Sequence, residues 1–135
     1  LIGAYRDDAD AHAPCRRWLD RSAAGPSSFG LSEAVVAGFL RIVTDQRIFK
    51  KPEPMTKALA FADWLRDQPA TVMISPGPRH WEIMKSLCQQ PGVQGPLVAD
   101  AWFAALAIEH GCEWVTLDQD FKRFPGLRIA SPLGG

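Results

Sequence analysis

The stretch from Leu97 to Phe121 constrains the fold more than any other part of this chain. It reads LVADAWFAALAIEHGCEWVTLDQDF. Apolar residues before Gly111 predict a helix over 97–110, Gly is the residue that commonly ends a helix, and the short apolar run Trp114–Leu117 predicts a buried strand. A carboxylate marks each element: Asp100 lies in the first helical turn, and Asp118 directly follows the strand. This pattern predicts a helix, a strand and an acidic turn in succession.

The rest of the chain alternates short apolar strands with helices of about a dozen residues, a pattern typical of α/β domains with a mostly parallel sheet. Asp10 and Ser32 are suitable N-caps for two of these helices. Further helices are predicted over residues 10–23, 31–45, 55–67 and 79–89, and further strands over 27–30, 71–74 (expected to be buried) and 127–130. We therefore predict one α/β domain over residues 1–135, with residues 131–135 as a tail.

Composition limits the classes of function. The chain is 47% hydrophobic and 22% charged, which is typical of a soluble globular protein, and no apolar run reaches the roughly 20 residues of a membrane helix. We expect a cytoplasmic protein without a membrane contact. The net charge is zero, so nucleic-acid binding would need local basic patches. Arg41, Arg47, Lys50 and Lys51 form one such group, which could contact phosphate but fits a solvated helix end better.

Two acids are predicted on apolar helix faces. Asp100 has Phe103, Ala104 and Ala107 as its neighbours one and two turns on, and Glu33 has a similar apolar set. A carboxylate in such a place needs a cation or a hydrogen-bond donor. Because residues 97–121 contain five acids and no Lys or Arg, a hard divalent ion, Mg²⁺ or Mn²⁺, is the natural counter-charge if Glu33, Asp100 and Asp118 converge.

Each of these acids also has a simpler interpretation. Asp100 and Glu33 both stand near a helix start, where the helix dipole alone favours acids. Asp118 and Asp120 could merely form a turn. Thr116, on the same side of the strand as Asp118, could orient a carboxylate or a bound water. No nucleophile motif surrounds Ser32, so capping is its better interpretation.

The sequence resembles the PIN-domain family, in particular the VapC-type ribonuclease toxins of toxin–antitoxin modules. The specific segments are LVADAWFAALAIEHG and WVTLDQDFKRFPGL, supported by LSEAVVAGFLRI and the opening LIGAYRDD. They span nearly the whole chain in the order of the family. The resemblance implies a three-layer α/β/α domain around a central, mostly parallel sheet.

The resemblance also implies an activity and its residues. It implies Mg²⁺- or Mn²⁺-dependent endonucleolytic cleavage of RNA, a homodimer, and inhibition by a cognate VapB-type antitoxin. Matched to this sequence, the catalytic and metal-binding acids of the family fall on Glu33, Asp100 and Asp118, an additional acid falls on Asp120, and a supporting hydroxyl falls on Thr116.

One feature of the family is absent from the sequence as given. The resemblance implies a first strand that ends in an Asp, a further metal ligand, a few residues before Leu1; Asp7 and Asp8 come too late to replace it. Either that strand lies upstream, or the domain lacks one ligand. Two other functions therefore stay open: a non-catalytic PIN-like module that binds protein, and a receiver-like phosphoacceptor. The receiver interpretation is disfavoured because no Lys follows Lys122.

Overall fold

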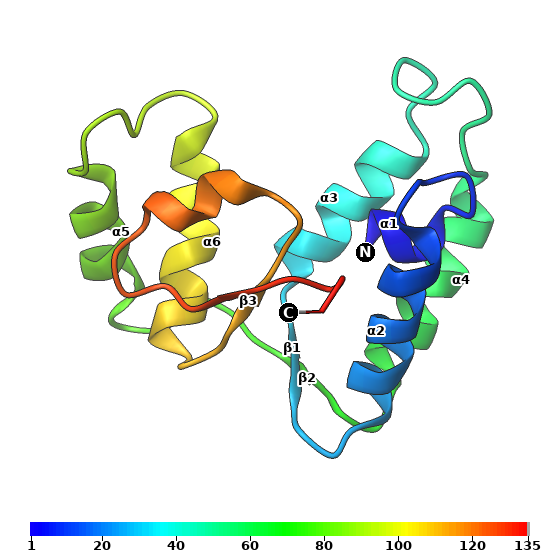
Figure 1. Cartoon of the computed structure of the whole chain (residues 1–135), viewed down its shortest axis with the longest axis horizontal. Helices are drawn as coiled ribbons and strands as arrows, with labels where there is room; N and C mark the ends of the chain where they lie inside the picture. Colours follow the sequence, from blue (N-terminus) through cyan, green and yellow to red (C-terminus); the bar gives the residue numbers. More distant parts are fainter. Residues whose placement is uncertain (135) are drawn as a thin grey trace. The chain divides into compact units, whose positions relative to one another are not determined.

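The computed structural model describes residues 1–134, which divide into two compact units between Ile74 and Ser75 (Figure 1). Each unit has its own apolar core. The single domain predicted over residues 1–135 stays a prediction. Of the predicted tail, Gly135 lies outside the described residues.

The first unit is an α/β unit built on one pair of parallel strands. It contains α1 (Ile2–Tyr5), α2 (His12–Ala24), β1 (Phe29–Leu31), α3 (Glu33–Val43), α4 (Met55–Arg66) and β2 (Thr71–Met73). β1 and β2 run side by side, with Phe29 opposite Thr71 and Leu31 opposite Met73. Helices α3 and α4 form the crossover that two parallel strands require.

Aromatic and aliphatic side chains fill the core of the first unit. Tyr5, Phe39 and Phe61 pack against one another, and the two contacts of Tyr5 are edge-on, the geometry that aromatic quadrupoles favour. Leu19 and Leu65 are fully buried beside them. The apolar stripes of α2, α3 and α4 therefore face this core, as their helical spacing predicts.

Of the two helix N-caps predicted in this unit, one is confirmed and the other is wrong. Ser32 caps α3, because its Oγ accepts a hydrogen bond of 3.1 Å from the Val35 N–H. The cap predicted at Asp10 is wrong. Helix α2 begins at His12, and its N-cap, Ala11, has no side-chain oxygen to offer. A turn in which the His12 N–H donates to the Ala9 carbonyl places the helix start beyond the aspartate.

Strand β2 is short and more exposed than its apolar sequence predicts. Val72 and Met73 are exposed, which contradicts the prediction of a buried strand. Among the described residues β2 pairs with β1 alone, so one edge of it has no ladder partner. Neither Val72 nor Met73 belongs to an apolar core of the described residues, so no packed element covers their side chains.

The second unit is also α/β, with a second pair of parallel strands. It contains α5 (His80–Cys88), α6 (Leu97–Glu109), β3 (Trp114–Val115), the 3₁₀ helix η1 (Gln119–Arg123) and β4 (Ile129–Ala130). Trp114 lies opposite Ile129, and Val115 lies opposite Ala130. Helix α5 packs along α6, and the buried core of this unit consists of Leu87, Ala101, Ala104, Ala105, Phe121 and Phe124.

Gly111 ends α6 as predicted. Its φ of +65° lies in the left-handed region that favours glycine. The Cys112 N–H donates to the Ala107 carbonyl at 2.8 Å, and the Gly111 N–H donates to the Ile108 carbonyl at 3.1 Å. These two bonds form a Schellman motif, which turns the chain from the end of α6 toward Trp114, the first residue of β3.

Both strands of this unit are shorter than predicted. β3 ends at Val115 rather than Leu117, although the Thr116 N–H still donates to the Ala130 carbonyl at 3.0 Å. Leu117 is exposed. The chain leaves the ladder there because Asp118 opens the 3₁₀ turn.

No helix within residues 1–134 is long and apolar enough to cross a membrane.

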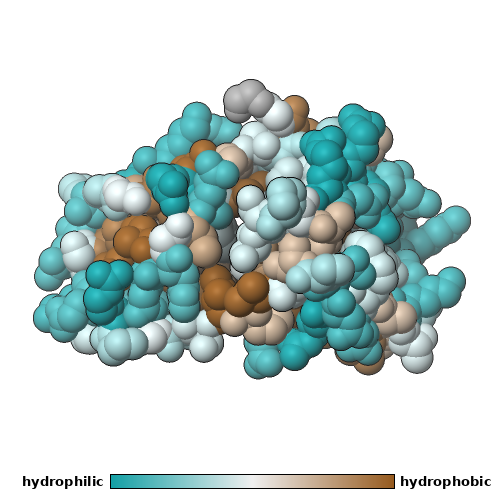
Figure 2. Space-filling view, turned by 90° about the horizontal axis from the view of Figure 1, so that it is seen from below, coloured by the Kyte–Doolittle hydropathy of each residue, from teal (hydrophilic) through white to brown (hydrophobic). Residues whose placement is uncertain are grey.

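On the face drawn in Figure 2, apolar residues (brown) are interrupted by hydrophilic ones (teal). Scattered exposed apolar residues of this kind are ordinary on a protein surface.

Candidate active site: the acids of α6 and η1

The second unit brings three predicted site residues within electrostatic range of one another. Asp100, in the first turn of α6, is partly buried. Its burial, and then the charges of Asp118 and Asp120, raise its pKa above the ordinary aspartate value, while Arg123 acts in the opposite direction. Like charges raise a carboxyl pKa only when they lie close together. The acids of the helix start and of the turn therefore form one cluster, the α6–η1 acid cluster (Asp100, Asp118 and Asp120).

Asp118 is fixed by hydrogen bonds on both sides. Its Oδ1 accepts from the Asp120 N–H at 2.9 Å and so caps η1. Its own N–H donates to the Thr116 Oγ at 3.0 Å. Asp118 therefore does form a turn, as its simpler interpretation predicts. A site role is compatible with this turn, because one of its carboxylate oxygens has no protein donor among the described residues.

Thr116 acts on the turn rather than on a carboxylate. Its hydroxyl oxygen accepts from the backbone N–H of Asp118, so it fixes the path of the chain where β3 passes into η1. We predicted that the two residues share one side of the strand, but β3 ends at Val115, before both of them. The support that it gives is to the backbone.

A cation that the sequence analysis missed lies next to the cluster. Arg123 Nε donates to the Asp120 carbonyl at 3.1 Å, and its Nη2 is 3.9 Å from the Asp120 Oδ1. The expectation that these acids have no side-chain cation beside them is therefore wrong. The i,i+3 spacing of Asp120 and Arg123 was the available signal. It was missed because Arg123 stands just outside residues 97–121.

Glu33 is in a different environment from the one that its sequence neighbours predict. Its side chain is 82% exposed, and it forms an ion pair of 3.5 Å with Arg66 of α4. The core-facing stripe of α3 runs through Phe39 and Val43, which leaves Glu33 outside it. Because Glu33 and the acid cluster belong to different units, their convergence stays a prediction.

No three His, Cys, Asp or Glu side chains in the described part of the chain are grouped as a ready metal site. Glu33 belongs to the first unit and Asp100 and Asp118 belong to the second, so the three-ligand site predicted from them stays a prediction. What the second unit provides is the acid cluster alone.

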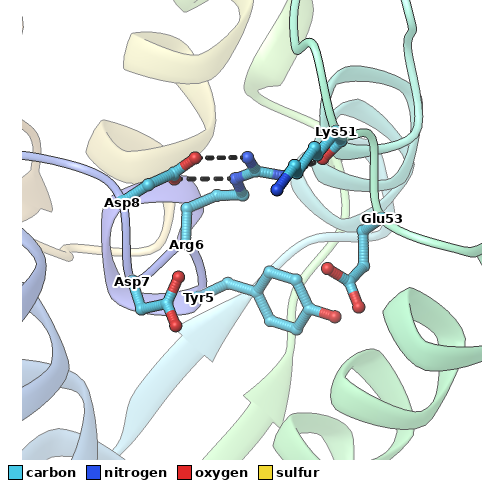
Figure 3. A pocket seen from close by; sticks show the side chains of 6 residues that line it. All are labelled: Tyr5, Arg6, Asp7, Asp8, Lys51 and Glu53. Carbon is cyan, nitrogen blue, oxygen red and sulfur yellow. Dashed lines mark hydrogen bonds and ion pairs between the residues drawn. The ribbon is translucent and has the colours of Figure 1, made fainter.

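A separate polar pocket of about 510 Å³ lies in the first unit. Its lining is Tyr5, Arg6, Asp7, Asp8, Lys51 and Glu53. Figure 3 shows Arg6 paired with Asp8 across the top of the pocket and the Tyr5 ring between Asp7 and Glu53.

Arg6 holds this pocket together. It is only 8% exposed, its Nε donates to Asp8 at 2.9 Å, its Nη1 donates to the Lys51 carbonyl at 2.9 Å, and its guanidinium lies 4.0 Å from the centre of the Phe49 ring. This ion pair lowers the pKa of Asp8. Asp8 is therefore paired with Arg6, and the inference that it does not replace the family's first acid stays a prediction.

Tyr5 stays protonated in this pocket. Burial, and then its hydrogen bond with Glu53, raise the pKa of Tyr5 to about 12. The phenol is thus a hydrogen-bond donor throughout the physiological range. The Tyr5 ring packs against the apolar core, so this part of the pocket lining also contributes to the stability of the unit.

Comparison with known proteins identifies the family. The PIN domain model matches residues 1–127. The chain is 40% identical to ribonuclease VapC25 of Mycobacterium tuberculosis over 132 residues, which cover 98% of this chain and 93% of that relative.

This chain belongs to the PIN domain family. A VapC ribonuclease of Mycobacterium bovis, Mb2897, is 38% identical over 135 residues, which cover all of this chain and 92% of that relative. The crystal structure of VapBC2 from Rickettsia felis bound to a DNA fragment from their promoter includes a chain of the same fold. It has a TM-score of 0.68 at 19% identity and covers 96% of this chain and 92% of that one.

Membership confirms two of the sequence predictions. The resemblance to the PIN domain and to VapC-type members was correct, and so was the α/β class with parallel strands. The receiver-like interpretation is excluded. The identities of the site residues, the metal ion and the oligomeric state are matters of proposal.

Proposed function

We propose that this PIN domain protein is an endoribonuclease that hydrolyses RNA phosphodiester bonds at the α6–η1 acid cluster with the help of Mg²⁺ or Mn²⁺. The observation that carries the proposal is the grouping of three acids at the start of α6 and in η1: Asp100 is partly buried, and its burial, followed by the charges of Asp118 and Asp120, raises its pKa. Acids held close together against their mutual repulsion are typical of functional sites. The VapC relatives that are named ribonucleases support the reaction class.

The chemistry of the acid cluster fits a hard divalent ion. Mg²⁺ prefers oxygen ligands and binds through one or two carboxylates, with waters and substrate phosphates completing its shell. Asp100 and Asp118 offer two such carboxylates, and an ion between them would relieve the repulsion that raises the pKa of Asp100. A two-carboxylate site is consistent with the absence of a three-ligand group from residues 1–134.

Each side chain has a proposed role. Asp100 and Asp118 would hold the ion, which would stabilise charge on the phosphate and supply an activated water. Asp120 keeps further negative charge at the edge of the site, and Thr116 keeps the turn in place. Glu33 is proposed as an additional acid of the site. The further Asp expected ahead of Leu1 stays a prediction.

We further propose that the protein is the toxin of a VapBC-type module. Its partners would be an RNA substrate, a cognate VapB-type antitoxin and a second copy of itself, in the cytoplasm. The similarity of fold to a chain of the R. felis VapBC2 complex supports this assignment, as do the VapC names of its relatives.

Cleavage of RNA by the purified full-length protein tests the function. A labelled RNA should be cut internally in the presence of Mg²⁺ or Mn²⁺, cutting should stop with EDTA, and it should return when the ion is added in excess. Cleavage that continues undiminished in EDTA would overturn the metal dependence. Intact RNA under every condition with several RNA pools would overturn the nuclease assignment.

A second candidate function is a PIN domain that binds protein without catalysis. The observation in its favour is that the described residues contain no three-ligand metal group. Titration calorimetry with Mn²⁺ separates the two functions. Heat of binding that disappears in Asp118→Asn favours the nuclease, and the lack of any binding to the wild-type protein favours the binding module.

A further inference from the structure

Arg123 stands beside the acid cluster with most of its guanidinium unused. It lies in the last turn of η1. Its Nε is tied to the Asp120 carbonyl at 3.1 Å, which anchors the side chain. Its Nη1 lies along Gly92, where an added Cβ would come within 3.8 Å of it. The guanidinium is therefore anchored to η1 through Nε and lies near the loop that precedes α6.

The hydrogen-bond donors of this guanidinium are not spent on the neighbouring acids. Arginine has five N–H donors, and of these Arg123 uses the one on Nε. The separation of 3.9 Å between Nη2 and the Asp120 Oδ1 is beyond hydrogen-bond range, although the two groups attract each other. Four N–H groups are thus free of protein acceptors within the described residues, and the side chain is 36% exposed.

The charge of Arg123 acts on Asp100. It lowers the pKa of that carboxyl and so opposes the rise that burial and the two neighbouring acids cause. A planar fork with free donors, tethered at Nε next to an acidic site, matches the bidentate geometry of a phosphate group.

We propose that Arg123 binds a phosphate of the RNA backbone next to the bond that is cut. This inference rests on the proposed function, because it adds a substrate-binding residue to the same site. The guanidinium donates two N–H bonds to the nonbridging oxygens of one phosphate, and so draws a polyanion to a cluster that would otherwise repel it. The tether to Asp120 sets the distance between that phosphate and the carboxylates.

The neighbouring basic residues give a matched comparison. Lys122 is adjacent in η1 and exposed, and within the described residues its side chain forms neither a hydrogen bond nor an ion pair with the acid cluster. Arg128 donates from Nη2 to the Gly111 carbonyl, so its guanidinium supports the turn after α6. Lys122→Ala therefore removes the same charge as Arg123→Ala without removing the proposed contact.

The test measures binding separately from cleavage. Affinity for a fluorescent single-stranded RNA is measured by anisotropy, at several salt concentrations, in Asp100→Asn protein, and then with Arg123→Ala, Arg123→Lys or Lys122→Ala added. We expect Arg123→Ala to weaken binding on the order of tenfold, the size of a charge-assisted hydrogen-bond pair. The slope of log K against log salt should fall by about 0.7, the value for one phosphate contact on a single strand.

The variants separate charge from geometry. Arg123→Lys should retain the salt slope and recover part of the affinity, whereas Lys122→Ala should change both by much less than Arg123→Ala. In cleavage by otherwise wild-type protein, Arg123→Ala should raise KM more than it lowers kcat. Melting curves identify any variant that has lost its fold, and Arg123→Lys keeps the test decisive if the alanine variant unfolds.

The outcomes for the two proposals differ. If wild-type protein cuts RNA, and Arg123→Ala binds RNA with the same affinity and salt slope as Lys122→Ala, the phosphate contact is refuted while the nuclease stands. If wild-type protein cuts no RNA but binds it through Arg123, the proposed function fails while the contact stands. If it neither cuts nor binds RNA, both are overturned.

Discussion

Replacing Ser32 by alanine tests whether this residue, which precedes Glu33, serves only as the N-cap of α3. The Ser32 hydroxyl accepts a hydrogen bond of 3.1 Å from the Val35 N–H and caps α3. Ser32 is only 3% exposed, so water cannot easily replace the hydroxyl once it is removed. The substitution should therefore destabilise the protein and leave its chemistry intact.

The expected loss follows from the cap and from its burial. Replacing an N-cap serine by alanine costs roughly 0.5–2 kcal/mol. A backbone N–H left unsatisfied in a buried place costs roughly 1–3 kcal/mol. Since both ranges describe the same lost bond, they are not added, and the burial of Ser32 places the effect in the upper part of the first range. We expect a decrease of about 1.5–2 kcal/mol in the free energy of unfolding.

Urea unfolding followed by circular dichroism measures this change. The m-value should stay the same and the midpoint should fall. Ser32→Asp keeps a capping oxygen and should lose much less stability than Ser32→Ala. RNA cleavage, corrected for the folded fraction, should be unchanged in both variants. Unchanged stability in Ser32→Ala would refute the cap, and abolished cleavage by a fully folded Ser32→Ala protein would refute the assignment to structure alone.

Three further predictions concern the units and the site. Because the pKa of Asp100 is raised on folding, its contribution to stability is fully present below the ordinary aspartate pKa and is lost as pH rises through the raised value. In metal-free buffer Asp100→Asn should therefore gain stability over wild type between acid and neutral pH, as denaturant midpoints would show, and a difference that does not vary with pH would contradict this. Gly77→Ala should lower the melting temperature, because the added Cβ would lie 2.7 Å from Oε2 of Glu109, whose other oxygen, Oε1, accepts a hydrogen bond from the Gly77 N–H. An unchanged melting temperature would show that the carboxylate moves freely. Leu19→Ala should cost roughly 2–5 kcal/mol in urea unfolding, because Leu19 is fully buried in the first core, and a loss below 1 kcal/mol would mean that this core is loosely packed.

Features set by neighbours in sequence were predictable. The cap at Ser32, the stop at Gly111 and the acidic turn after β3 each depend on contacts over a few residues, and the structure has all three. The cap at Asp10 failed even though it was local. The turn before α2 places the helix start at His12, so Ala11 and not Asp10 occupies the N-cap position.

Features set by packing between elements could not be read from spacing. Glu33 looked buried because its helical neighbours are apolar, but which side of α3 faces the core is decided by its packing on α4, where Arg66 pairs with it. The burial of Arg6 likewise depends on a residue far along the chain, Lys51, whose carbonyl accepts its hydrogen bond. In the site, the acidic turn at Asp118 and Asp120 was predictable, whereas the counter-charge of Arg123 had only the i,i+3 spacing from Asp120 as a signal.

The rate of RNA cleavage by Asp100→Asn, compared with that by Glu113→Gln, shows whether the acid cluster is the catalytic site. Both variants remove one carboxylate from the second unit, but Glu113 is exposed and lies outside the acid cluster. With Mg²⁺ in excess, we expect Asp100→Asn to lose cleavage by several orders of magnitude while Glu113→Gln cuts at the wild-type rate. Cleavage by Asp100→Asn at the wild-type rate would show that the acid cluster is not the catalytic site.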